Sequence, residues 1–275
     1  GDKNTAIGYG ALTFSIYSGN CSASLNTAVG CEALNQNITG FSNVSAGVQS
    51  QYSNTTGYYN VATSPYALGK NTTGRYNIAM GFNAGYALIS GSNNNTFIGT
   101  QADATVQLSN STAIGNGAKV NVSNKVRIGN SSVTVIGGAV NWSITKVPAL
   151  FITNKKENVP GLLFINKLKP ITFNVDEERF AKFLGMADSV SDTEKKLYSI
   201  ASNKICSGLM PEEVEKTAEE IGYNFDGIKP PQNEKDNYSI AYADFVPSLV
   251  KTVQELSGEN EKLKSKNDSE RLEVN

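Results

Sequence analysis

The chain holds few of the side chains on which enzymes commonly rely. It has no histidine, which excludes a Ser-His-Asp triad, a Cys-His dyad and a histidine-ligated metal within the chain. Cys21, Cys31 and Cys206 are too few for a four-thiolate zinc site and too sparse for a disulfide framework. A bridge between Cys21 and Cys31 stays an alternative, and we expect Cys206 to be a small core residue.

Two adjacent acids, Glu212 and Glu213, are the remaining candidates for acid–base chemistry. Neighbouring helical residues do not face each other, and acids are common in the first turn of a helix, where the dipole favours them. We therefore expect them to be solvent-facing helix residues. These residue types favour a protein without a cofactor or a resident metal.

Charge divides the chain into two halves. Its 275 residues suffice for two domains of ~100–200 residues each. Residues 1–140 contain six basic and three acidic residues, whereas residues 141–275 contain 18 and 22. The net charge of −1 argues against a nucleic-acid partner, and no apolar run reaches the ~18–20 residues of a membrane span. We place domain boundaries at 1–140 and 141–275. Because Gly1 falls within a repeat pattern, we expect a fragment of a longer protein.

Asparagine anchors a repeat in the first domain. Asn26, Asn43, Asn60 and Asn77 are 17 residues apart, and Asn95 follows after 18. Most anchors are followed by four residues in a fixed order. These are a small or apolar residue, commonly an alanine, an aliphatic residue and a glycine. This alternation predicts strands of four or five residues, with Gly and Asn in the turns because they tolerate positive φ. Stacked coils bury the apolar face that one coil cannot cover. We predict a mainly-β solenoid or β-roll fibre over 1–140.

Five tyrosines recur within this repeat. They cap coil edges or pack between chains, or they form a glycan-binding stripe; both interpretations stay open. The five are Tyr58, Tyr59, Tyr66, Tyr76 and Tyr86. The repeat itself resembles the head repeats of trimeric autotransporter adhesins and the shafts of phage tail fibres. That resemblance implies a virion tail fibre or a bacterial cell surface, with a host glycan or protein receptor as partner.

The second domain combines short helices and strands. Residues 162–168 form an amphipathic element, residues 171–175 alternate like a strand, and Pro211 starts a helix that runs to Ile221. A heptad helix covers about 245–266. Steps of 4, 3, 4 and 3 define its a/d seam, with Asn260 at an a position. We predict a coiled coil between chains, and a helix packed on its own domain is the alternative. The seam residues are Leu249, Val253, Leu256, Asn260 and Leu263.

Three stretches of the second domain carry a family resemblance. Residues 168–173, 208–215 and 242–256 agree in order and spacing with the peptidase S74 domain, the C-terminal intramolecular chaperone of phage tail spikes and fibres. The resemblance covers ~144–264 and implies an α+β chaperone domain that assembles a homotrimer and folds the upstream fibre. It also implies self-cleavage, in which a serine is the nucleophile and a lysine its base.

The self-cleavage motif itself is altered. Val147 and Ile152 stand where the family has its serine and its lysine, and neither side chain can act as nucleophile or base. We therefore expect a chaperone that no longer cleaves itself. The alternative is an active autoproteolytic serine endopeptidase with a relocated dyad, in which Ser143 pairs with Lys146 or Lys155.

Overall fold

The computed structural model describes residues 3–14, 22–88, 90–133, 135–137, 152–183, 198–200, 202–234 and 236–273. The chain divides into two compact units. The first comprises Gly1–Ile136 and Asp176–Ser202, and the second comprises Gly137–Val175 and Asn203–Asn275. The asparagine repeat thus falls in unit 1 and the heptad helix in unit 2.

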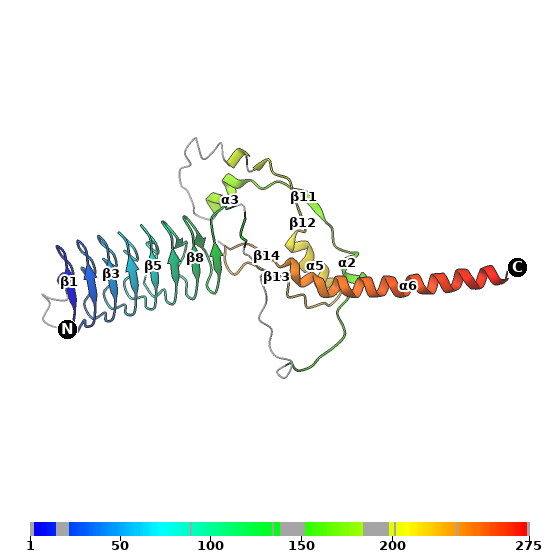
Figure 1. Cartoon of the computed structure of the whole chain (residues 1–275), viewed down its shortest axis with the longest axis horizontal. Helices are drawn as coiled ribbons and strands as arrows, with labels where there is room; N and C mark the ends of the chain where they lie inside the picture. Colours follow the sequence, from blue (N-terminus) through cyan, green and yellow to red (C-terminus); the bar gives the residue numbers. More distant parts are fainter. Residues whose placement is uncertain are drawn as a thin grey trace. The chain divides into compact units, whose positions relative to one another are not determined.

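Unit 1 is a β-solenoid around one eight-stranded parallel sheet, whose strands follow one another along the chain (Figure 1). Equivalent repeat residues pair in register, as Ala62 does with Ala79. The short strands β7 (Asp103–Ala104) and β9 (Lys119–Val120) form a second parallel pair. The predicted solenoid is therefore confirmed. The sheet consists of β1 (Thr5–Ile7), β2 (Thr27–Val29), β3 (Val44–Ala46), β4 (Val61–Thr63), β5 (Ile78–Met80), β6 (Thr96–Ile98), β8 (Thr112–Ile114) and β10 (Val126–Ile128).

A ladder of buried asparagines holds the coils in register. The Asn60 backbone N–H and Nδ2 donate to Oδ1 of Asn43, at 2.9 and 3.2 Å. Oδ1 of Asn60 accepts the same two bonds from Asn77, at 3.0 and 3.1 Å. Nδ2 of Asn60 also donates to the Gly74 carbonyl at 2.8 Å. Because a buried amide left without partners costs ~1–3 kcal/mol, each asparagine of the ladder depends on the next. Ser111 ends the ladder, and its backbone N–H donates to Asn95 Oδ1 at 3.1 Å. The ladder runs through Asn4, Asn26, Asn43, Asn60, Asn77 and Asn95.

The strands have three residues, rather than the four or five that the alternation predicts. Each of the first six sheet strands is followed by a residue with positive φ, for example Gly30 at 135° and Gly47 at 145°. A Cβ on Gly30 would lie 2.6 Å from the carbonyl oxygen of Gly47, so close stacking of the coils also requires glycine. Ser64 takes this position after β4 with φ of 118°, which is strained for a residue other than glycine.

The interior of the solenoid is narrow, and it selects small side chains. The middle residue of most strands faces inward and is alanine, as in Ala28, Ala62 and Ala79, all fully buried. Phe97 replaces alanine in β6, and Gly85 makes room for it, because a Cβ on Gly85 would lie 3.0 Å from the Phe97 ring. Stacking therefore buries the small residues, and the branched residues of the strands remain exposed.

Unit 2 carries short elements before a long C-terminal helix. β11 (Ile171–Phe173) pairs antiparallel with β12 (Cys206–Gly208), and β13 (Ile228–Lys229) with β14 (Ser239–Ile240). The heptad helix is confirmed as a helix and continues past its expected end at residue 266. Within the described residues, no helix is long and apolar enough to cross a membrane. The helices of the unit are α2 (Leu162–Ile165), α5 (Pro211–Glu220), the 3-10 turn η2 (Tyr242–Phe245) and α6 (Val246–Glu273), whereas α3 (Glu177–Phe183) belongs to unit 1.

Aromatic residues form the core of unit 2. Phe225 contacts Phe164 of α2 and Phe245 of η2, with ring centroids 5.2 and 4.6 Å apart. α5 packs on this cluster; it starts at Pro211 and is followed by Gly222 with φ of 67°. The predicted start and stop of this helix are therefore confirmed to within one residue, and the core fixes α5 and α6 in one unit.

Candidate assembly surface

The outer side of the eight-stranded sheet carries three columns of uncharged residues, many of them apolar and the rest mainly threonine and asparagine. The columns are the first residue of each strand, its third residue, and the residue two positions after the strand, and we call this surface the sheet face. Hydrogen bonds between coils continue through the third column, where Glu32 N–H donates to the Tyr9 carbonyl at 2.7 Å. The large exposed apolar residues on it are Ile7, Tyr9, Val29, Val44, Val48, Ile78, Met80, Phe82, Ile98, Ile114, Val126 and Ile128.

None of the residues of the sheet face is charged. Six other large apolar residues are exposed in the described part of residues 3–133. Three of them, Leu25, Tyr59 and Tyr76, lie two positions before a strand of the sheet. The other three are Phe14, Ile38 and Val133. A typical monomer exposes apolar patches of roughly a few hundred Å², and larger ones mark interaction sites. An uncharged apolar surface through eight coils therefore has the chemistry of a protein interface.

Aromatic residues gather before the strands of the middle coils. Phe41 stacks on Tyr58 with ring centroids 4.7 Å apart, and Tyr59 stacks on Tyr76 at 5.3 Å. The Arg75 guanidinium lies over the Tyr58 ring at 5.5 Å, and its Nη1 donates to the Tyr58 hydroxyl at 2.8 Å. We call these five residues the entry cluster. Phe41, Tyr58 and Arg75 are 17 residues apart, so the repeat period identifies two members that a search for tyrosines misses.

A second aromatic group follows β4 and β5. Tyr66 packs edge-on against Phe82 at 5.9 Å and against Tyr86 at 6.5 Å. The Lys70 ammonium lies 4.7 Å from the centre of the Tyr86 ring. We call these four residues the exit cluster. The predicted tyrosine stripe is therefore two clusters, one at each end of the strands.

Helix α6 turns a polar side to its own unit and an apolar side to solvent. Ser248 and Thr252 are buried, whereas the apolar residues of the predicted seam are all exposed. Asn260 is exposed on the same side, and Val246 lies one heptad step before the seam begins. The structure thus brings the five predicted seam residues, Leu249, Val253, Leu256, Asn260 and Leu263, together along one helix face.

The polar side of α6 is fixed by contacts within unit 2. Oε2 of Glu255 accepts the backbone N–H of Leu162, the first residue of α2, at 2.7 Å. Gly161 leaves the space for this carboxylate, because a Cβ there would lie 2.6 Å from Oε2. Thr252 Oγ1 donates to the Ser248 carbonyl at 2.9 Å. The Glu255 bond joins α6 to α2, the Thr252 bond lies within α6, and the apolar seam residues remain exposed.

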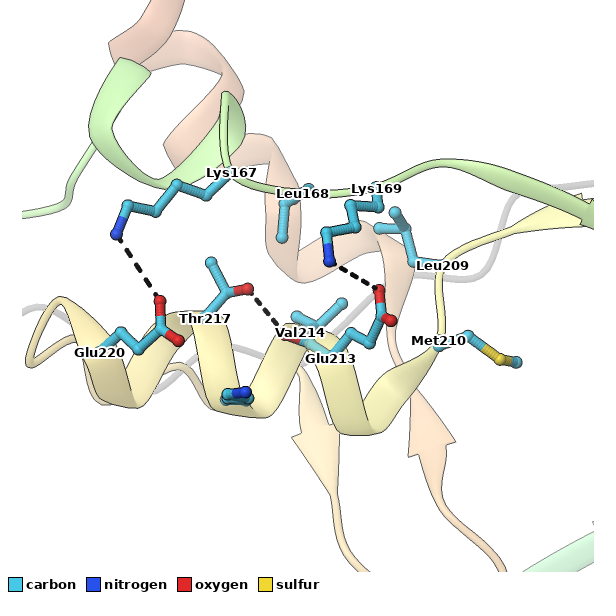
Figure 2. A pocket seen from close by; sticks show the side chains of 10 residues that line it. Lys167, Leu168, Lys169, Leu209, Met210, Glu213, Val214, Thr217 and Glu220 are labelled. Atoms are coloured by element: carbon cyan, nitrogen blue, oxygen red, sulfur yellow. Dashed lines mark hydrogen bonds and ion pairs between the residues drawn. The ribbon is translucent and has the colours of Figure 1, made fainter.

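A slot of about 310 Å³ lies between α5 and the segment that carries Leu168 (Figure 2). Leu168 points into it, and two ion pairs cross it, Lys167–Glu220 at 3.7 Å and Lys169–Glu213 at 4.0 Å. All four charged side chains are substantially exposed, so each pair contributes at most ~1 kcal/mol. Glu213 is thus an ion-pair partner of Lys169, and the slot is a packing seam rather than a built ligand site.

The residues considered for self-cleavage are only partly within the described chain. Ser143, Lys146 and Val147 lie outside the described residues. Ile152 and Lys155 are exposed on the segment that precedes α2. Neither Val147 nor Ile152 carries a nucleophile or a base, whatever their surroundings.

Asp103 on β7 is a buried carboxylate of the solenoid, with 4% of its surface exposed. Its oxygens accept the N–H groups of Ala87 at 3.0 Å and Ala104 at 2.8 Å, and Lys119 Nζ lies 3.7 Å away. Burial raises the pKa of Asp103 to about 6, while the charge of Lys119 and the backbone bonds act in the opposite direction. Asp103 therefore titrates close to neutral pH.

The cysteines do not form a chemical site. Cys31 is an exposed free thiol, and Cys21 lies outside the described residues. Cys206 is half-buried on β12 and is not part of the unit 2 core, so the expectation of a core residue is wrong. In the part of the chain that the structure describes, no three Cys, Asp or Glu side chains group as metal ligands.

Comparison with known proteins gives no relative. No protein-family model, no curated protein and no solved structure matches the chain.

Proposed function

We propose that the chain is a subunit of a homotrimeric β-fibre, and that its C-terminal unit joins the chains and folds the solenoid. The observation that carries this proposal is the sheet face, which is uncharged along all eight strands and exposes large apolar side chains at seven of them. A second copy of the same parallel solenoid supplies a surface of the same length and chemistry. Such a fibre belongs on a virion tail or a bacterial surface, where a glycan or protein receptor is its target.

Features of the C-terminal unit support an assembly of three chains. Residues 168–173, 208–215 and 242–256 resemble the S74 chaperone domain, whose members assemble as trimers. The exposed seam of α6 has the a/d spacing of a coiled coil, and Asn260 at an a position is the kind of residue that fixes register and oligomeric state. The seam and the sheet face therefore support one proposal from two units of the chain.

The solenoid has a physical need for a folding partner. Its strands pair with strands 14–22 residues away, and its small interior offers little apolar area before the coils stack. Before neighbouring coils stack, the edges of their strands are open to mispairing. A C-terminal unit that joins three chains first raises their local concentration and aligns their registers.

Self-cleavage is not part of the proposed function. Val147 and Ile152 replace the reactive pair of the S74 motif, and a hydroxyl needs a neighbouring base to attack a peptide. We expect the chaperone unit to remain attached to its fibre.

Denaturing mass spectrometry, combined with light scattering of the native protein, tests both statements. The proposal predicts an intact chain of 29.4 kDa in a particle of ~88 kDa, the mass of three chains. Fragments that end near residues 142–147 would show that cleavage survives, and loss of those fragments in Ser143→Ala would assign the nucleophile. An intact monomer at micromolar concentration would contradict the trimeric fibre.

A further inference from the structure

The two aromatic clusters lie at the same level of the solenoid. β4 has Tyr58 and Tyr59 within three residues before it and Tyr66 within three residues after it. β5 has Tyr76 before it and Phe82 after it, in the same windows. Within the described residues, no other strand of the sheet has aromatic residues within three positions on both sides. Among the described strands of the sheet, the two clusters therefore flank only β4 and β5, in the middle of the sheet face.

Symmetry decides which surfaces of two copies meet at these flanks. When identical parallel chains surround a common axis, the edge of one sheet face that precedes the strands meets the edge of the next that follows them. Equivalent coils then lie at equal heights. Antiparallel copies would instead bring like edges together. Aromatic clusters on opposite edges at one height thus suit parallel chains in a ring.

We propose that the entry cluster of each chain packs against the exit cluster of the neighbouring chain, so that an aromatic belt closes the fibre at β4 and β5. The inference rests on the proposed trimer and names the contact that fixes its register. Aromatic pairs contribute more than the area that they bury, and the belt repeats at every chain interface. The belt would therefore align three otherwise repetitive solenoids at one defined level.

The geometry of the entry cluster favours a protein partner over a saccharide. Sugars bind tyrosine through a free ring face. Tyr58 lies between Phe41 and the Arg75 guanidinium, and Tyr59 and Tyr76 cover each other. Tyr59 and Tyr76 each place one ring face on the other and stay 47% exposed, and the edges of such rings pack favourably against the faces of other rings. The cations do not oppose this contact, since Arg75 and Lys70 are each placed over a tyrosine of their own cluster.

Dityrosine cross-linking in the full-length assembly tests the belt. Native particles that contain mixed ¹⁴N and ¹⁵N chains are photo-oxidised and digested, and linked peptides are identified by mass. We expect mixed-isotope links that join Tyr58, Tyr59 or Tyr76 to Tyr66 or Tyr86. The double variant Tyr66→Phe/Tyr86→Phe, which keeps the rings but not the phenols, should lose the inter-chain links and keep its native mass. Tyr52→Phe is the matched control and should keep the links.

The outcomes separate the belt from the trimer. Particles of trimer mass without mixed-isotope links, or with links between two entry clusters, would overturn the belt and leave the trimer in place. Trimers that lack the links, but bind immobilised lactose in a manner lost in Tyr76→Ala, would replace the belt by a saccharide surface. A monomeric chain would overturn the proposed function itself.

Discussion

Ser64 shows how closely single residues control the coil. It occupies the turn position after β4 that is glycine after β2, β3 and β5, and its φ of 118° is unfavourable for any residue with a Cβ. Ser64→Gly should raise the free energy of unfolding by about 1 kcal/mol, because the relief of strain exceeds the added entropy of the unfolded chain. Thermal melts followed by circular dichroism measure this change. Ser53→Gly, at an ordinary φ, should lower stability; a lower melting temperature for Ser64→Gly would contradict the account.

The asparagine ladder gives a second prediction at this scale. Asn60→Ala removes the acceptor of two bonds from Asn77 and a donor to the Gly74 carbonyl. We expect a loss of about 3 kcal/mol, since the partners stay buried without replacement. Thr56→Ala, at an exposed position outside the sheet face, is the control and should change stability little. Equal urea midpoints for the two variants would show that the ladder is not a main source of stability.

Asp103 makes stability depend on pH. Its pKa is about 6 in the folded chain, against 3.8 for an ordinary aspartate, so it binds its proton more tightly when folded. The stabilising contribution is complete below about pH 3.8 and is lost as pH rises through about 6. Relative to Asp103→Asn, which cannot titrate, the native chain should lose ~3 kcal/mol between pH 4 and pH 7. Urea melts of both proteins across this range test the difference, and parallel curves would contradict a raised pKa.

At the scale of elements, some residues of α6 hold the helix on unit 2, and others form the proposed seam between chains. Leu256 is 44% exposed and lies on the seam, whereas Glu255 accepts a backbone bond from α2 and Thr252 is buried. Leu256→Lys should therefore leave the helix in place and weaken the trimer, because it sets three charges around one apolar layer. Gln254→Lys adds the same charge outside the seam. Light scattering over a dilution series should show dissociation of the first variant alone; equal masses would exclude the seam as a contact.

The sequence determines these elements to different degrees. The period of 17 follows directly from asparagine spacing, because each ladder residue must meet the next, and the heptad seam follows from the steps between Leu249 and Leu263. The side of the strand that faces inward does not follow from alternation. It depends on the width of the coil, which admits Ala62 and excludes Val61. The strand ends escape prediction for a related reason, since stacking of Gly30 on Gly47 sets them.

The sequence predicts only some members of the entry and exit clusters. Tyrosine type selects Tyr58, Tyr59 and Tyr76, but the contribution of Phe41 and Arg75 depends on which coils stack. Likewise, the exposure of the sheet face can be predicted only when the residues that fill the interior of the coil are known. The resemblance of the C-terminal unit to S74 domains remains a prediction, and the masses of the native and denatured protein test it.

At the scale of the whole molecule, both units leave a row of apolar residues exposed in addition to their buried apolar cores. Ile78 and Met80 are exposed while Ala79 between them is buried, and Leu249 is exposed while Ser248 is buried. A monomer with this arrangement would be poorly soluble. The arrangement is economical in a trimer, where the outer surfaces of each chain form the common core.

Oxidation of Met80 tests this claim most directly. Met80 on the sheet face is 46% exposed in the single chain, and Met210 in unit 2 is 37% exposed. Hydrogen peroxide converts accessible methionine to its sulfoxide, which peptide mass spectrometry quantifies at each position. If the sheet face is the core of the assembly, Met80 in the native particle should oxidise far more slowly than in the urea-unfolded chain, and more slowly than Met210. Oxidation of native Met80 at the rate of the unfolded chain would show that the sheet face is open to solvent, and would contradict the fibre.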